Sequence, residues 1–298
     1  MSSAALAYDP PRAEDWSQAL LADGYCIIPD LMPRTKVAAL HDDLKDRFAK
    51  TPFCDGDFYG NHTKRFGSLL KRSSHAADFV QHPLIMEIAQ AALGPFCDRF
   101  QLNLTQALEI WPGEYEQVPH RDQDMWRGEQ GRIEYLINVM WPFTPYRKEN
   151  GATVVWPGSH KRQTEFELDR ADAIEAEMDP GSALVFLGST LHGAGANTTR
   201  APRAGMIVSY CLGWLKPYEN QWLAYPPQIA RTFPPDLAGL VGYRQHRPNL
   251  GNYEGQCPSV LLGDSLPEYL GSVDELRDDQ VEPLAEFKAR QRTGRGAS

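Results

Sequence analysis

The chain has 298 residues, and its 30 Lys plus Arg against 39 Asp plus Glu give a formal net charge of −9. A chain of this length can bury a sizeable core in one large domain or two small ones. The acidic balance argues against nucleic acid or an anionic membrane as the main partner, and no apolar run approaches the roughly 18 residues of a transmembrane helix. The five cysteines form no CxxC pair and the N-terminus lacks a signal-peptide pattern, so we expect a reduced, cytoplasmic protein.

The first hundred residues combine helical and irregular patterns. Residues 1–13 are small and polar, which predicts a flexible N-terminal arm. A β-branched run at 25–28 predicts a short strand, and apolar residues at helical spacing predict a helix over 33–50. A second helix is predicted over 83–93, because Gly and Pro follow it directly. The stretch 53–70 carries Gly, Asn and aromatic residues and is predicted to be a loop.

From residue 98 the hydrophobic period changes towards two, which indicates strands. The predicted strands are 99–110, 133–140, 152–156, 174–178, 183–187 and 204–212. Many short strands with Pro/Gly turns, preceded by helices, predict a mainly β fold: a double-sheet barrel with helical cover. We expect one domain over 14–291 with its barrel core at 98–215. A capping-box pattern that ends at Glu275 predicts a last helix over 273–290, and 292–298 is expected to be disordered.

The segment that ends in His120-Arg121-Asp122 carries the most chemical information. In an extended segment residues i and i+2 point to the same side, so His120 and Asp122 could aim at one point. An isolated HxD is more often a surface His beside a solvated Asp. His192 follows a predicted buried strand and would complete the two-His, one-carboxylate triad of non-haem Fe(II) oxygenases, although a hydrogen-bonded core histidine is the alternative. A site with only N and O donors suits Fe(II) better than structural zinc.

An anion anchor is predicted close to this triad. Arg203 lies eleven residues after His192, at the start of the predicted strand 204–212. A guanidinium is well shaped for a bidentate contact with a carboxylate. Arg200 is the competing candidate, and either arginine taken alone is more often a surface charge.

Several motifs in one order and spacing resemble the phytanoyl-CoA dioxygenase (PhyH-like) family. They are His120-Arg-Asp122, Glu149-Asn-Gly-Ala-Thr153, Pro157-Gly-Ser-His160, and His192 with Arg203. The resemblance covers about residues 20–265 and is closer to the natural-product branch, which tailors terpenoids and alkaloids. It implies a double-stranded β-helix (a jelly roll, or cupin-like barrel) and an Fe(II)- and 2-oxoglutarate-dependent oxygenase that uses O₂.

The resemblance also implies roles for individual residues. The implied iron ligands are His120, Asp122 and His192. Arg203 would pair with the distal carboxylate of 2-oxoglutarate. Gln117 and Thr153 match positions beside the co-substrate, and Arg65 is a further candidate for a substrate or co-substrate contact. His160 would be structural, holding the end of a strand.

The implied reaction is hydroxylation, desaturation or related C–H oxidation of a small, largely apolar substrate, with release of succinate and CO₂. One alternative is a Zn- or Mn-dependent cupin-like hydrolase or isomerase, which needs no 2-oxoglutarate. A second is an acyl-CoA hydroxylase of the phytanoyl type, which calls for a basic patch, and a third is a non-catalytic binding module. The basic candidates for such a patch are Lys64, Arg65, Lys71 and Arg72.

The segment 215–265 is predicted to act as a lid and as a homodimer contact, from the same or the neighbouring subunit. It lacks strand periodicity but is rich in aromatic residues that something must cover. These aromatic residues are Trp222, Tyr225, Phe233 and Tyr243.

Overall fold

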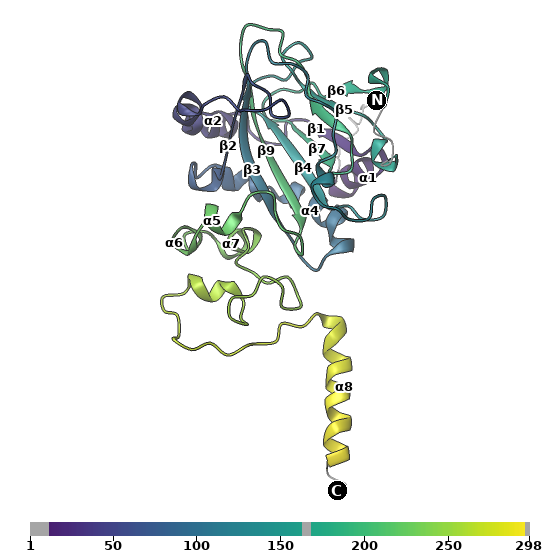
Figure 1. Ribbon diagram of the computed structural model, residues 1–298, viewed down its shortest axis with the longest axis vertical. Coiled ribbons are helices and arrows are strands. Elements are labelled where there is room, and N and C mark those ends of the chain that lie inside the picture. The colour runs from purple at the N-terminus through teal and green to yellow at the C-terminus, as the bar shows by residue number, and fades with distance from the viewer. Residues whose placement is uncertain (1–11, 163–167, 296–298) are drawn as a thin grey trace, which may run out of the picture.

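The computed structural model describes residues 12–162 and 168–295. Most of the predicted N-terminal arm, residues 1–11, and the end of the predicted tail, residues 296–298, lie outside the described residues. The centre of the molecule is a large antiparallel sheet in the strand order β1-β7-β4-β9-β3-β2 (Figure 1). Its strands are β1 (Tyr25–Ile28), β2 (Thr63–Gly67), β3 (Phe100–Ile110), β4 (Leu136–Pro142), β7 (Ala183–Leu187) and β9 (Arg203–Leu212).

A second, smaller sheet has the order β6-β5-β8. Its strands are β5 (Thr153–Val155), β6 (Ile174–Glu175) and β8 (His192–Ala194). The two antiparallel sheets with helices outside form a double-stranded β-helix, as the sequence predicted. Among the described residues, no helix combines the length and the apolar composition needed to cross a bilayer.

Helices cover the outer face of the large sheet. They are α1 (Ala13–Asp23), α2 (Arg34–Lys50), α3 (Ala76–Val80) and α4 (Pro83–Leu93). In α2 the buried residues are Val37, Leu40, Leu44 and Phe48, which recur at helical spacing on one face. Pro83 at the first position of α4 already has the backbone angle that a helix needs.

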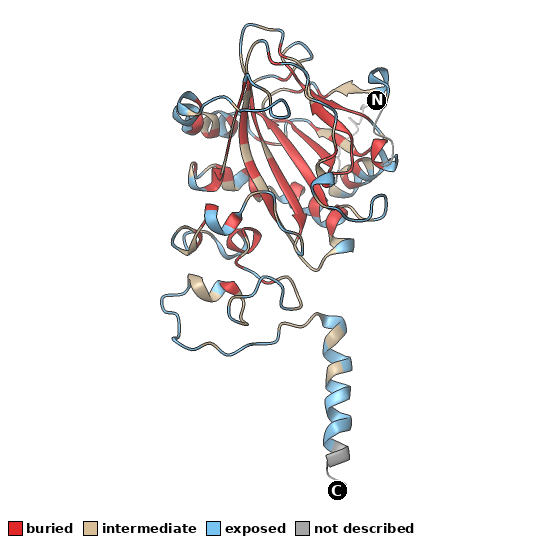
Figure 2. Cartoon of the chain, viewed as in Figure 1, coloured by how far each residue is buried: buried red, intermediate tan, exposed pale blue. Residues whose placement is uncertain are grey.

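Figure 2 shows that the strands of the large sheet are mostly buried. Their side chains alternate between two apolar cores. In β7, Val185 packs in the core shared with the helices, whereas Leu184 and Phe186 pack in the core between the two sheets. Val155 of β5 closes this inner core from the small sheet. The interior between the two sheets is therefore packed with apolar side chains.

Several local predictions differ from the structure, and helix α3 and strand β8 were not predicted. Helix α1 was not predicted, and β2 lies within the predicted loop 53–70. The last helix is α8 (Asp278–Arg295) rather than 273–290, so residues 292–295 of the predicted tail are helical. Residues 272–277 are not helical, so the predicted capping box does not form, and the carboxylate of Glu275 accepts a hydrogen bond from Arg99 at 3.0 Å.

The segment 215–265 folds back on the core instead of staying irregular. Its helices are α5 (Gln221–Ala224), α6 (Pro227–Ala230) and α7 (Pro235–Leu240). Tyr225 and Tyr243 are buried, and the Tyr243 hydroxyl donates to the carbonyl of Tyr225. The expectation that these two aromatics need a cover from outside the domain was wrong. Trp222 remains 45% exposed.

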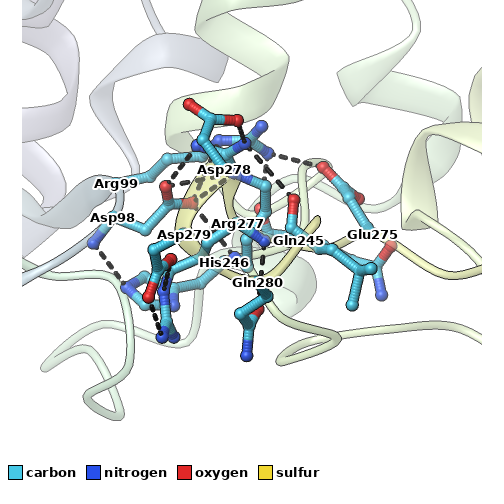
Figure 3. A network of polar contacts seen from close by, with 11 residues as sticks. Asp98, Arg99, Gln245, His246, Glu275, Arg277, Asp278, Asp279 and Gln280 are labelled. Atoms are coloured by element: carbon cyan, nitrogen blue, oxygen red, sulfur yellow. Dashed lines mark hydrogen bonds and ion pairs between the residues drawn. The ribbon is translucent and has the colours of Figure 1, made fainter. Parts of the chain in front are cut away.

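The C-terminal part ends in α8, which extends away from the body of the molecule (Figure 1). A charged network holds the root of this arm (Figure 3). Arg247 donates to Asp98 at 2.7 Å and also contacts Asp278 at 3.1 Å, while Arg99 contacts Glu275. Side chains therefore attach the arm to the rest of the molecule: Asp98 and Arg99 lie just before β3, and Arg247 lies in a loop.

Candidate metal centre

Three side chains converge on one point at an open end of the barrel. His120 precedes the short 3₁₀ turn Asp122–Met125, and His192 is the first residue of β8. One ligand atom from each of His120, Asp122 and His192 lies within 4.8 Å of the other two. The Nε2 atoms of His120 and His192 lie 3.4 Å and 3.6 Å from the two carboxylate oxygens of Asp122.

The backbone explains this convergence. His120 and His192 exchange two hydrogen bonds, N–H to carbonyl in each direction, at 2.9 Å and 3.0 Å. Arg121 between the two ligands is extended, with φ −116° and ψ 125°. His120 and Asp122 therefore point to the same side, as the HxD spacing predicted.

Each ligand side chain is also oriented by a second contact. The Nδ1 atoms of His120 and His192 lie 2.9 Å and 3.0 Å from the carbonyls of Val118 and Thr190. A carbonyl only accepts, so Nδ1 carries the proton and the Nε2 lone pair faces the site. The amide of Asn138, a buried residue of β4, donates to Asp122 at 3.0 Å. Such contacts hold metal ligands in place, and no sequence motif pointed to Asn138.

The electrostatics of the three groups suit a cation. Burial alone would raise the pKa of Asp122, but the nearby His192 and His120 lower it to about 2. Burial lowers the pKa of His192 to about 4. Burial also acts to lower the pKa of His120, but its contact with Asp122 raises it overall. At neutral pH Asp122 is therefore a carboxylate and His192 a neutral imidazole, the forms that bind a metal ion.

All seven residues expected at the site line one cavity of about 350 Å³. They are His120, Asp122, His192, Arg203, Gln117, Thr153 and Arg65. They come from distant parts of the chain, and the two facing sheets bring them together.

Arg203 is the first residue of β9 and is only 1% exposed. Its guanidinium lies 4.2 Å from the ring centre of Tyr146, and its Nε and Nη1 atoms have no hydrogen-bond partner. Arg65 donates to Gln106 at 3.2 Å, but its buried Nε also lacks a partner. Within the described residues, neither Arg203 nor Arg65 has a carboxylate within 4.0 Å. Arg200, the competing candidate for the anion anchor, is exposed. Two buried guanidinium groups without an acid fit an anionic ligand, because leaving them unpaired is costly.

Gln117 joins two walls of the cavity. Its side-chain amide donates to the carbonyl of Phe58 at 3.0 Å and accepts from the backbone N–H of Ala194 at 3.3 Å. Thr153, in β5, is the strand partner of Ala194. Gln117 therefore already has protein partners on both ends of its amide, and a co-substrate contact would add to them or replace one.

Aromatic residues form the mouth of the cavity, and they lie outside the sequence motifs that predicted the site. Phe58 stands edge-on to the ring of His120, with 4.8 Å between ring centres. The hydroxyl groups of Tyr59 and Tyr218 are in hydrogen-bond contact across the mouth. Among the described residues of the segment 215–265, Tyr218 alone lines the cavity.

The basic patch considered for an acyl-CoA does not form. Lys64 is buried and donates to the carbonyl of Phe48, and Arg65 faces the cavity. Arg72 donates to the carbonyl of Gly67. His160 of the Pro-Gly-Ser-His motif does not line the cavity, and its ring Nε2 lies 3.1 Å from the carbonyl of Leu21 near the end of α1, so this contact is to a helix and not to the expected strand end.

Comparison with known proteins agrees with this geometry. The family model described as Phytanoyl-CoA dioxygenase (PhyH) matches residues 20–205. Dioxygenase aneA of Aspergillus aculeatus is 30% identical over 244 residues, which cover 76% of this chain and 81% of the relative. Dioxygenase FrzG of Cladobotryum sp is 32% identical over 236 residues, covering 74% of this chain and 76% of the relative.

Solved structures share the fold at lower identity. The non-heme alpha ketoglutarate dependent epimerase SnoN from nogalamycin biosynthesis gives a TM-score of 0.56 at 19% identity, covering 69% of this chain and 84% of that one. SnoN has also been crystallised in complex with Fe3+, alpha ketoglutarate and nogalamycin RO. The carbocyclase SnoK gives a TM-score of 0.54 at 20% identity, covering 69% of this chain and 87% of that one.

Proposed function

The chain belongs to the phytanoyl-CoA dioxygenase family, and we propose that it oxidises a small, largely apolar, natural-product-like molecule with Fe(II), 2-oxoglutarate and O₂, releasing succinate and CO₂. The observation that carries this proposal is that His120, Asp122 and His192 share one cavity with two buried guanidinium groups. Relatives named dioxygenases and a similarly folded enzyme crystallised with Fe3+ and alpha ketoglutarate support it. Hydroxylation, desaturation and related C–H oxidations are the reactions in question.

The residues present fit Fe(II). Two neutral imidazoles and one carboxylate form the donor set that suits a non-haem iron centre. His120 and His192 would bind through Nε2 and Asp122 through a carboxylate oxygen, while Asn138 keeps the carboxylate oriented. Bound iron supplies the oxidising chemistry with O₂, and the protein supplies orientation and a cavity that limits access of water.

The co-substrate would occupy the inner part of the cavity. We assign the distal carboxylate of 2-oxoglutarate to Arg203, because its Nε and Nη1 are buried and free to donate. Arg65 provides a second positive group on the same cavity. Gln117 and Thr153 would contact the co-substrate from the walls formed by β8 and β5.

The substrate would enter past the aromatic mouth. Phe58, Tyr59, Met125 and Tyr218 line the cavity and are each partly exposed, so they offer apolar contact area to a ring-containing molecule. Tyr59 and Tyr218 would together close the entrance. In that case only the first residues of the segment 215–265, and not the whole segment, act as the lid. Exclusion of water after closure protects the oxidation from side reactions.

We also propose a homodimer in the cytoplasm. Trp222 and Leu223 of α5 are exposed on the outside of the domain, which supports a covered surface in the assembly. All five cysteines are free, which fits a reducing compartment. Light scattering at micromolar concentration should give twice the chain mass of 33.5 kDa, and a mass near 33.5 kDa would exclude the dimer.

The test of the function is anaerobic reconstitution. Fe(II) and 2-oxoglutarate together should produce a weak visible charge-transfer band, which His192→Ala should abolish. His75→Ala, a histidine before α3 and outside the cavity, is the matched control and should keep the band. Admission of O₂ with a panel of terpenoids, alkaloids and acyl-CoAs should then give succinate. Normal succinate formation by His192→Ala would contradict the metal assignment.

The hydrolase alternative predicts a different result in the same experiment. A Zn- or Mn-dependent hydrolase would turn over without 2-oxoglutarate and would remain largely active in Arg203→Ala. An absolute requirement for 2-oxoglutarate excludes it.

A further inference from the structure

Arg121, the middle residue of His120-Arg121-Asp122, is more buried than any of the three candidate ligands. Its side chain is 2% exposed, and because the segment is extended it points away from the two ligands on either side. Its Nε donates to the carbonyl of Ser189 at 3.0 Å. Its Nη2 donates to the carbonyls of Ser159 at 3.3 Å and Arg162 at 3.1 Å.

These carbonyls belong to two segments that carry or support the third ligand. Ser189 lies in the turn between β7 and β8, three residues before His192. Ser159 lies in the turn after β5, and its hydroxyl accepts from the backbone N–H of Leu191, the residue next to His192, at 2.9 Å. Arg121 therefore connects the segment that carries His120 and Asp122 to the turn before His192 and to the turn after β5 that supports it.

The chemistry of the guanidinium suits this task. Its donors lie in one rigid plane, so bonds to several carbonyls fix the relative position of the segments that carry them. A hydrogen bond from a charged donor is also stronger than one from a neutral donor. Backbone hydrogen bonds join the two segments at His120 and His192, at Gln117 and Ala194, and at Gln123 and Gly188. The side chain of Arg121 adds bonds of its own behind them.

We propose that Arg121 is a positioning residue that sets the distance between the His120/Asp122 pair and His192, and thereby the affinity and coordination geometry of the metal site. The inference rests on the proposed function, since it assumes that the site binds a divalent metal. It assigns no contact between Arg121 and the metal, the co-substrate or the substrate.

The experiment measures metal binding instead of turnover. Co(II) titration at low temperature gives a Kd, and the d–d absorption of bound Co(II) reports coordination geometry. Arg121→Met keeps the length of the side chain but removes all donors, and loss of such support should weaken Co(II) binding about 10- to 100-fold. Arg121→Lys keeps the charge but not the planar fork, and should give an intermediate Kd with a shifted spectrum.

Two controls separate positioning from general destabilisation. Arg127→Met removes an exposed arginine six residues further on and should leave the Kd and spectrum unchanged. Tyr210→Phe removes a buried hydrogen bond to Val80 at 2.6 Å, in a part of β9 that does not line the cavity. It should lower Tm without changing the Kd.

The outcomes are distinct. A folded Arg121→Met with a Kd within about twofold of wild type and an unchanged spectrum would overturn the inference and leave the proposed function standing. If Arg121→Met does not fold, Arg121→Lys decides, and wild-type binding with a wild-type spectrum would overturn the inference in the same way. Failure of the wild-type protein to bind Co(II) or Fe(II) would instead remove the proposed function itself.

Discussion

Replacing Arg203 by Met distinguishes an arginine that serves a ligand from one that serves the fold. The guanidinium is buried, lies over Tyr146 and leaves Nε and Nη1 without partners. Met has a similar length and fills much of the same space, but it has no charge and no donor. The substitution therefore removes the interaction with an anion while largely preserving the packing.

The expected effect on 2-oxoglutarate is large. Two charge-assisted hydrogen bonds to one carboxylate contribute about 1.5–3 kcal/mol each, and breaking a buried ion pair costs about 3–5 kcal/mol. Taking the latter range, the KM for 2-oxoglutarate should rise roughly 150- to 5,000-fold, since each 1.4 kcal/mol is about tenfold. Fe(II) binding should be unchanged, because Arg203 is not one of the ligands.

The effect on the ligand-free protein should have the opposite sign. Arg203→Met removes a desolvated charge, whose burial costs several kcal/mol, and loses a cation–π contact with Tyr146 worth about 2 kcal/mol. The Tm of the ligand-free variant should therefore stay level or rise by roughly 2–4 °C. In wild type, 2-oxoglutarate at a hundred times its Kd should stabilise the protein by about 2.7 kcal/mol, and this shift should vanish in the variant.

The assays are succinate formation at varied 2-oxoglutarate and thermal unfolding with and without it. Arg200→Met is the matched control, because Arg200 is exposed on the turn just before β9. A KM within threefold of wild type, together with a fall in Tm of the ligand-free protein, would show that Arg203 is structural. A larger KM effect in Arg200→Met would show that the anchor is the other arginine.

Two further predictions concern stability. Burial raises the pKa of Glu134, which accepts from the Ser189 hydroxyl, from 4.5 to about 7. Between pH 4.5 and about pH 7 the folded protein keeps a proton on Glu134 that the unfolded chain has released, so the free energy of unfolding falls as pH rises. Glu134→Gln removes this titration and should raise the free energy of unfolding by up to about 3 kcal/mol at pH 8 and by little at pH 5. Urea unfolding at the two pH values measures the difference. At the root of the C-terminal arm, Asp98→Asn weakens the contact with Arg247 and should destabilise the protein by about 1–3 kcal/mol and speed proteolysis after residue 247. Asp236→Asn, on an exposed carboxylate, should change neither, and equal proteolysis of the two variants would refute the anchoring role.

The sequence predicted most strands because their apolar patterns are strong. The bounds of β1 and β7 agree with the expected runs, and α4 agrees with the predicted second helix. Helix α1 was missed because it buries little: only Ser17 and Leu20 are fully buried, so no clear apolar stripe marks it. It ends at Gly24, whose positive φ of 84° closes the helix, and this glycine was the one available signal.

Strand β2 was missed for a different reason. Its sequence contains Lys64 and Arg65, which suggested a solvated or phosphate-binding surface. In the structure the Lys64 ammonium reaches the carbonyl of Phe48 and lies 5.2 Å from the ring of Trp111, while Arg65 faces the cavity. Whether a charged side chain is buried depends on partners far away in the chain, and no local pattern contains that information.

The convergence of His120, Asp122 and His192 was predictable, and the groups that orient these side chains were not, because the two sets obey different constraints. Ligand identity is restricted by metal chemistry to a few residue types, and an HxD with a later His is visible in the chain. A ligand side chain, by contrast, can be oriented by any hydrogen-bonding group that lies close enough to it. Asn138 comes from β4, and the carbonyls of Val118 and Thr190 orient the histidines through the backbone alone. Backbone acceptors carry no sequence signal, so this part of the site is specified by the fold.

The same argument explains where the precision of the site comes from. His120 and His192 are held by reciprocal backbone hydrogen bonds, so strand pairing sets their basic separation, and the side chain of Arg121 supports it from behind. Gly193 sustains this pairing, because a Cβ there would lie 3.0 Å from the carbonyl of Gln117 and push the two segments apart. A larger residue at this position would move His192 relative to Asp122 without touching any ligand. The glycine that follows the last ligand is thus part of the metal site, although it offers no side chain to it.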